Sequence, residues 1–367
     1  MSAALALSPQ TRVWRSDAPL PLVSGETLPG LQLAYRTWGR LNAAADNAVV
    51  VCHALTGNAD LDAWWPALLG AGRSIDPERD FVICSNVLGG CGGSSGPLSP
   101  APDGLAWGRR FPAIGIRDQV HAQMRLADAL GVRRIRWVIG GSMGGLQALE
   151  WGLMDRERVG GIVCIAASAS HSAWCLALNE AQRLALRADL RFNDGDYAAD
   201  APPRAGLAAA RAIAMVSYRA PGSLDERFGR RSSEPGALDA RSWLRHHGER
   251  FVERFDANSY LALIDAMDRH DVGEGRGGVA AALGEVDVPA LVVSIPSDQL
   301  YPQAEQFALC EALPKARLVR LASPHGHDGF LIDAPALDGL LLGFRQSHER
   351  VRLAYPAARA ARPERMA

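Results

Sequence analysis

One serine, Ser142, lies in a setting suited to nucleophilic chemistry, within the stretch R-I-R-W-V-I-G-G-S-M-G-G-L-Q-A-L-E-W at 134–151. The apolar run 135–139 predicts a buried strand, the glycines predict a sharp turn, and 146–151 predicts the start of a helix. A serine on such a strained turn, with small neighbours at Gly140 and Gly144, projects its hydroxyl as a nucleophile. Gly-rich loops with a serine also arise by chance, and the flanking strand and helix favour the nucleophile.

A serine nucleophile needs a histidine to take its proton and an acid to hold that histidine. With this kind of turn they follow in the order serine, acid, histidine, each after a later strand. Asp298 follows the apolar run 289–295, and His327 follows the run 316–321 within S-P-H-G-H-D-G-F-L. Asp298 could instead cap a turn, and His325 is a rival base. We favour His327 because Gly326 before it permits a close backbone turn.

Acyl transfer through Ser142 also needs two backbone N–H donors for the oxyanion that forms. The residue after the nucleophile, Met143, supplies one in this type of site. The second comes from the loop after an earlier strand, here H-A-L-T-G at 53–57, which follows the apolar run 47–52. We therefore predict Leu55 as the second donor and interpret His53 as a structural residue of that loop.

The elements that position these residues alternate between strands and helices. Continuous apolar runs predict strands buried by helices on both faces, with an alternating early edge strand at 31–39. The remaining predicted strands are 47–52, 80–85, 135–139, 160–167, 289–295 and 316–321, and the predicted helices are 116–130, 307–313 and 335 to about 346. The loop 86–97 is half glycine and proline but lacks the lysine of a phosphate-binding loop, so we expect it to shape a pocket wall.

The composition changes between 170 and 284, where Ala, Arg, Asp and Glu occur at helical spacing. We therefore predict an α/β fold with a mostly parallel central sheet, formed by 1–169 and 285–350, and a helical lid insertion at 170–284. The Ala/Arg/Pro-rich end, 351–367, predicts a disordered tail.

Overall composition argues against several classes of protein. The 367 residues are 48% hydrophobic and 22% charged, with a net charge of −1, which gives no electrostatic case for nucleic acid or an anionic membrane surface. The six cysteines show no C-x-x-C spacing, and Cys52, Cys84 and Cys164 lie in apolar runs as small buried hydrophobes. We expect no metal site. No run reaches transmembrane length and the N-terminus lacks signal-peptide features, so we expect a cytoplasmic protein.

Eight ordered motifs between about 31 and 344 resemble those of the homoserine O-acetyltransferase family, which has the α/β-hydrolase fold. They are H-A-L-T-G, N-V-L-G-G-C, G-S-S-G-P, F-P-x-I-x-I-R-D, G-G-S-M-G-G-x-Q-A-L-E-W, F-D-A-N-S-Y-L, S-D-Q-L-Y-P and G-H-D-G-F-L. By this resemblance Ser142, Asp298 and His327 are the triad. Arg211 would bind the carboxylate of the amino acid substrate and Asp328 its ammonium; otherwise they would be a solvated helix arginine and a loop aspartate.

The resemblance implies ping-pong transfer of an acetyl group from acetyl-CoA to L-homoserine, with no further cofactor, in methionine biosynthesis. It also implies a homodimer that associates through the lid helices. Relatives that transfer succinyl groups to homoserine or serine, and hydrolases with the same triad, are the alternatives. Gln299, Leu300 and Tyr301, which follow the acid, offer no cation for a succinyl carboxylate, so we expect an acetyl donor.

Overall fold

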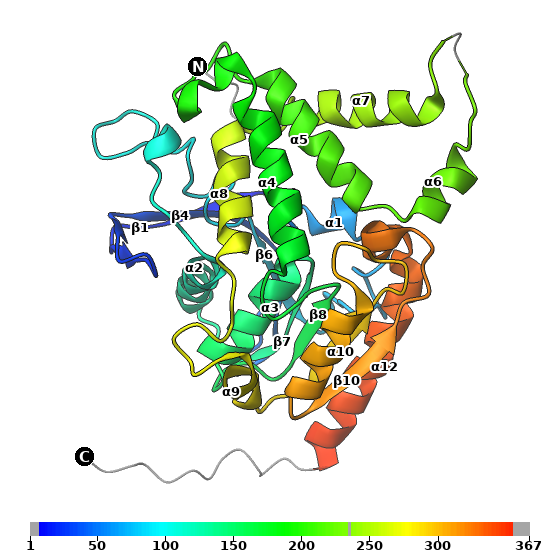
Figure 1. The fold of residues 1–367 in the computed structure, drawn as a ribbon. Helices are drawn as coiled ribbons and strands as arrows, with labels where there is room; N and C mark the ends of the chain where they lie inside the picture. The colour runs from blue at the N-terminus through cyan, green and yellow to red at the C-terminus, as the bar shows by residue number, and fades with distance from the viewer. Residues whose placement is uncertain (1–6, 234–235, 355–367) are drawn as a thin grey trace.

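The computed structural model describes residues 7–233 and 236–354, shown as a ribbon in Figure 1. A central sheet carries helices on both faces, and a set of further helices lies over one end of it. This is the predicted α/β architecture with a mostly parallel sheet.

The sheet has eight strands in the order β1-β4-β6-β5-β7-β8-β9-β10. The pairs β1–β4 and β4–β6 are antiparallel and the others are parallel. The strands are β1 (Arg12–Ser16), β4 (Leu31–Trp38), β5 (Ala48–Cys52), β6 (Phe81–Ser85), β7 (Ile135–Gly141), β8 (Ile162–Ile165), β9 (Ala290–Ser294) and β10 (Ala316–Arg320). Two short strands, β2 (Leu20–Pro21) and β3 (Thr27–Leu28), form a separate pair.

The prediction of an edge strand at 31–39 is wrong in its placement. β4 lies second in the sheet, because β1 pairs with its outer side. The sequence does not predict β1, because its residues, R-V-W-R-S, are mostly exposed and two are arginines, so no apolar pattern marks them. Charged residues on an outermost strand are a common protection against edge-to-edge pairing.

Alternate side chains of the central strands point to opposite faces, and each face has its own hydrophobic cluster. Val50 packs into one cluster with helices α2 (Ile116–Ala129), α3 (Met143–Met154) and α10 (Gln303–Ala312). Val49 and Val51 pack into the other with α1 (Leu61–Trp64) and α12 (Ala334–Ala354). Cys52, Cys84 and Cys164 are buried, as expected.

The segment predicted as a lid forms helices that cover the carboxyl end of the sheet (Figure 1). They are α4 (Ala173–Arg187), η2 (Leu190–Gly195), α5 (Arg204–Ser217), α6 (Pro221–Arg227), α7 (Asp239–Phe251) and α8 (Ala257–Asp268). The last helix of the segment, α9 (Val279–Gly284), instead lies beside α10 at the other end of the sheet (Figure 1). Leu207, Phe251 and Tyr260 from these helices share a hydrophobic cluster with Leu55 and Met143 of the core. The lid helices thus pack directly on the predicted oxyanion residues. The boundaries of a separate lid unit stay a prediction.

The C-terminal helix is longer than predicted. It begins at Ala334, one residue before the predicted start, and continues to Ala354 instead of ending near Gln346. Residues 351–354 of the expected disordered tail are therefore helical, and 355–367 lie outside the described residues. None of the helices in the described ranges is long and apolar enough to cross a membrane.

Candidate active site

Ser142 lies between the end of β7 at Gly141 and the start of α3 at Met143, with φ 56° and ψ −127°. This left-handed conformation is strained for a residue with a side chain. A Cβ atom at Gly140 would lie 2.0 Å from the carbonyl oxygen of Gly144, and one at Gly144 would lie 2.1 Å from that of Cys52. The turn therefore requires glycine at both positions.

Hydrogen bonds anchor the turn on both sides. The Ser142 N–H donates to the Ile165 carbonyl of β8 at 2.9 Å, and the Ser142 carbonyl accepts from the Gly145 N–H at 2.7 Å. The helix begins at Met143, three residues before the predicted Leu146, because Gly144 and Gly145 take helical positions despite their low propensity. A Cβ at Gly145 would lie 2.6 Å from the Ala167 side chain, so packing decides that position.

Asp298 follows β9, and His327 lies in the short helix η3 (Gly326–Asp328) after β10. His327 Nδ1 is 2.7 Å from Asp298 Oδ2. The other oxygen, Asp298 Oδ1, accepts the N–H groups of Leu300 at 2.8 Å and Tyr301 at 3.0 Å. Asp298 thus caps its own turn, which was the structural alternative, and also pairs with the histidine. The rival His325 instead has Nδ1 3.0 Å from Ser223 Oγ.

A neighbour of the acid joins the two loops. Ser297 Oγ accepts the Gly326 N–H at 2.9 Å and donates to the Ser323 carbonyl at 2.7 Å. Ser297 therefore fixes the loop that carries Asp298 relative to the loop that carries His327. In the sequence, the only signal for this role of Ser297 is its position next to Asp298.

Three aromatic rings surround the His327 imidazole. The ring centroids of Tyr301, Phe330 and Tyr218 lie 5.4, 5.5 and 5.7 Å from that of His327. A Cβ at Gly141, beside the serine, would lie 2.7 Å from the Phe330 ring, so this ring lies between the serine turn and the histidine. His327 Nε2 is buried and has no hydrogen-bond partner among the described residues. Catalytic contacts are often incomplete without substrate.

Opposing effects act on the pKa of His327. Burial lowers it, but the charge of Asp298, the hydrogen bond to Asp298 and the charge of Asp328 together raise it above the ordinary histidine value. An imidazolium at this position is therefore stabilised, as an acid–base group that must accept a proton requires.

The loop after β5 contains His53 and the predicted donor Leu55. His53 Nδ1 is 2.8 Å from the Ala54 carbonyl, and the Val87 N–H donates to His53 Nε2 at 3.2 Å. Burial lowers the His53 pKa to about 4, so the ring is neutral and holds the loop, as we interpreted it. The N–H groups of Leu55 and Met143 donate to no residue in the described ranges, which leaves both available to an oxyanion.

Arg211, on α5, reaches the same loop from the lid. Its Nη1 lies 3.4 Å from Thr56 Oγ1, and its guanidinium carbon lies 5.0 Å and 5.5 Å from the ring centroids of Phe251 and Tyr218. Arg211 forms no ion pair with a carboxylate among the described residues. It is a cation available to an anionic ligand.

Asp328, beside His327, already has a cationic neighbour that the sequence analysis did not identify. Its Oδ2 lies 3.1 Å from Nε of Arg219, in the lid segment that follows α5. Burial raises the pKa of Asp328, while the charges of Arg219, His327 and Arg211 oppose that rise. The structure therefore places both predicted substrate-binding residues, Arg211 and Asp328, close to the His327–Asp298 pair.

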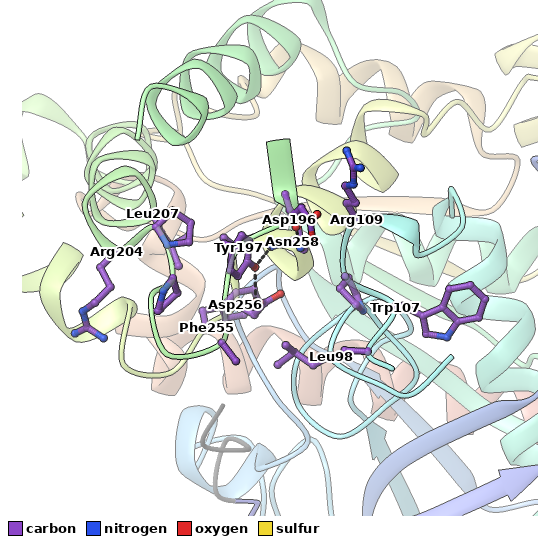
Figure 2. Close-up of a pocket in the computed structure, with 18 of the residues that line it drawn as sticks. Leu98, Trp107, Arg109, Asp196, Tyr197, Arg204, Leu207, Phe255, Asp256 and Asn258 are labelled. Carbon is purple, nitrogen blue, oxygen red and sulfur yellow. Dashed lines mark hydrogen bonds between the residues drawn. The ribbon is translucent and has the colours of Figure 1, made fainter. Parts of the chain in front are cut away.

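A cavity of about 780 Å³ lies away from these residues, between 97–110, 195–207 and 252–258 (Figure 2). Its wall includes Tyr197, whose hydroxyl donates to Asp256 Oδ1 at 2.6 Å and accepts the Asn258 N–H at 2.9 Å. None of the three triad residues lines it. The loop 86–97 lines a smaller cavity of about 180 Å³ that also touches Leu55, in keeping with its expected place in a pocket wall.

Comparisons with known proteins identify the fold and the family. Residues 47–334 match the family described as having the alpha/beta hydrolase fold. The chain is 48% identical over 341 residues to the homoserine O-acetyltransferase of Chlorobaculum tepidum, covering 93% of this chain and 96% of that protein. The chain belongs to the homoserine O-acetyltransferase family.

Solved structures show the same fold. The homoserine O-acetyltransferase of Staphylococcus aureus superposes with a TM-score of 0.75 at 31% identity, covering 91% of this chain and 95% of that one. Esterase E22 superposes with a TM-score of 0.84 at 24% identity, covering 91% and 99%. The fold of the homoserine O-acetyltransferase family is thus shared with ester hydrolases, and the residues around the triad must decide the acceptor.

Proposed function

We propose that this protein transfers an acetyl group from acetyl-CoA to L-homoserine and so forms O-acetyl-L-homoserine for methionine biosynthesis. The observation that carries the proposal is the pairing of His327 with Asp298, linked to the Ser142 turn through the Phe330 ring. Arg211, which forms no ion pair among the described residues, and the carboxylate of Asp328 lie near the same histidine. A plain esterase has no need of two opposite charges next to its histidine, whereas an amino acid acceptor presents a carboxylate and an ammonium. The 48% identity to a homoserine O-acetyltransferase also supports it.

In the first half of the reaction, Ser142 Oγ attacks the thioester carbonyl carbon of acetyl-CoA. His327 Nε2 takes the serine proton and then gives it to the departing thiolate of CoA, which leaves an acetyl ester on Ser142. Asp298 holds the Nδ1–H of His327 and stabilises the imidazolium that forms between the two steps. The N–H groups of Leu55 and Met143 would stabilise the oxyanion.

In the second half, the homoserine hydroxyl attacks the ester carbonyl while His327 Nε2 takes its proton. Collapse of the intermediate returns that proton to Ser142 Oγ and releases O-acetylhomoserine. Arg211 would bind the carboxylate of homoserine and Asp328 its ammonium, so that the hydroxyl is presented to the ester.

Water competes with homoserine for the acetyl-enzyme, and the lid supports selection of the alcohol. Lid residues Phe251 and Tyr260 share a hydrophobic cluster with Leu55 and Met143, and Ser142 is only 6% exposed. A site closed in this way excludes bulk water from the ester.

We also propose a cytoplasmic homodimer that associates through the lid. The expectation comes from the family resemblance, and the lid elements expose several large apolar side chains that a second copy would cover. They are Trp174, Leu176, Leu184, Leu190 and Val216. Light scattering of the parent protein and of Leu184→Glu tests this, with a dimer expected for the first and a shift toward monomer for the second.

The test of function offers the purified enzyme acetyl-CoA and succinyl-CoA, each with homoserine, with serine and with no acceptor, and follows free thiol release. We expect the highest kcat/KM for acetyl-CoA with homoserine and slow release without an acceptor. Fast release that does not depend on an acceptor would identify a hydrolase, and faster turnover of succinyl-CoA would overturn the acetyl assignment.

A further inference from the structure

The loop that carries His327 and Asp328 is held by the lid segment between α5 and α6. The Asp328 N–H donates to the Tyr218 carbonyl at 3.1 Å, and a Cβ at Gly326 would lie 2.6 Å from the Ala220 backbone nitrogen. Gly326 has φ 71°, so this close approach and the backbone conformation both require glycine. The position of the histidine loop is therefore set by contact with the lid as well as by β10.

Arg219 lies at the centre of this contact. Its Nε is 3.1 Å from Asp328 Oδ2, an ion pair that lacks hydrogen-bond geometry, and the side chains are only 13% and 17% exposed. Its guanidinium carbon is 5.8 Å from the ring centroid of Trp243 on α7, which holds the arginine from its other side. A carboxylate buried to this degree is costly to ionise without a counter-charge, and Arg219 supplies that charge before any substrate arrives.

The two oxygens of Asp328 have different surroundings. Oδ2 faces Arg219, whereas Oδ1 accepts no hydrogen bond from any residue in the described ranges. The contact with Arg219 therefore occupies one side of the carboxylate and leaves the other side available. An ammonium bound at Oδ1 would leave the contact between Arg219 and Oδ2 in place.

We infer that Arg219 is a positioning residue for the acceptor. Its contact with Oδ2 keeps Asp328 ionised and fixes the orientation of the carboxylate. The other oxygen, Oδ1, then selects alcohols that bear an ammonium. This inference rests on the proposed function, in which Asp328 binds the homoserine amine. The opposite role is that Arg219 competes with the ammonium for Asp328. The two roles predict changes of opposite direction when the arginine is removed.

The test compares L-homoserine with 4-hydroxybutanoate, which keeps the hydroxyl and the carboxylate but lacks the amine. In Arg219→Met and Arg219→Gln, the ratio of kcat/KM for homoserine to kcat/KM for 4-hydroxybutanoate should fall about tenfold, the scale of one hydrogen bond to a charged group. Arg219→Lys keeps a cation near Asp328 and should retain most of the parental ratio. A loss of packing alone would slow both acceptors equally and would not move the ratio.

Arg227→Met is the matched control. Arg227 also lies over Trp243, at 5.9 Å, but forms no ion pair with Asp328, so its removal should leave the ratio at the parental value. An unchanged or increased ratio in both Arg219→Met and Arg219→Gln would overturn the inference. A parent enzyme with no preference for homoserine over 4-hydroxybutanoate would instead contradict the proposed function, and the role of Arg219 with it.

Discussion

Asp298 contacts His327 with one carboxylate oxygen, 2.7 Å from Nδ1, while the backbone N–H groups of Leu300 and Tyr301 hold its other oxygen. The carboxylate therefore cannot rotate without breaking two backbone hydrogen bonds. An acceptor at Nδ1 places the ring proton on that nitrogen and leaves the lone pair of Nε2 facing away from Asp298. This is the tautomer that a general base for Ser142 requires.

Replacing the serine tests the nucleophile. Ser142→Ala should abolish acetyl transfer, because no other hydroxyl lies on the strained turn, and it should leave the free energy of unfolding nearly unchanged. With acetyl-CoA alone, intact-protein mass spectrometry under rapid quench should show one added acetyl group on the parent and none on Ser142→Ala. A parent that turns over normally but never carries the acetyl group would indicate direct transfer in a ternary complex.

Replacing the acid tests the tautomer. Asp298→Asn can donate to Nδ1, which favours the wrong imidazole tautomer, and the corresponding change in serine proteases costs about 10⁴-fold in kcat. We expect a loss of that order in thiol release with homoserine present. His325→Asn is the matched control, because His325 contacts Ser223 instead of the acid, and it should keep most of the activity. A larger loss from His325→Asn than from Asp298→Asn would reverse the assignment of the base.

The pH dependence should follow the raised pKa of His327. His327 must be neutral to accept a proton, so activity is lost as the pH falls through its pKa. Because this pKa lies above the ordinary value of 6.5, the acidic limb of kcat/KM for homoserine should lie above pH 6.5. Removing the Asp298 charge lowers the pKa, so in Asp298→Asn the limb should move to lower pH. Identical limbs in the two enzymes would show that another group titrates.

A buried carboxylate on α3, the helix that follows Ser142, tests stability. Glu150 is fully buried in α3 and pairs with Arg117 at 3.2 Å and with Arg276 at 2.8 Å. Glu150→Ala leaves two partly buried cations without their partner, and we expect a loss of about 3 kcal/mol in the free energy of unfolding. Arg156→Ala, which breaks the exposed pair with Glu285, should cost less than about 1 kcal/mol. Urea denaturation of both variants measures the difference, and similar losses would contradict the role of burial.

The sequence by itself determined the elements whose pattern is local. The apolar runs 47–52, 135–139 and 289–295 predicted buried strands because both faces of a central parallel strand are covered by helices. The glycines around Ser142 predicted its turn because only glycine fits where backbones meet within about 3 Å of a Cβ position. Each of the three residues Ser142, Asp298 and His327 was predicted because it follows a predicted strand, in the order serine, acid, histidine.

Only the tertiary structure decided which side chains meet across elements. β1 consists mostly of exposed residues, so no apolar pattern predicted it. This strand occupies the edge of the sheet in place of β4. Arg219 comes to lie beside Asp328 when the lid packs on the sheet. Phe330 comes to lie between Gly141 and His327 when the C-terminal segment packs there. Such contacts depend on where distant backbones cross, and neither periodicity nor spacing within one segment carries that information.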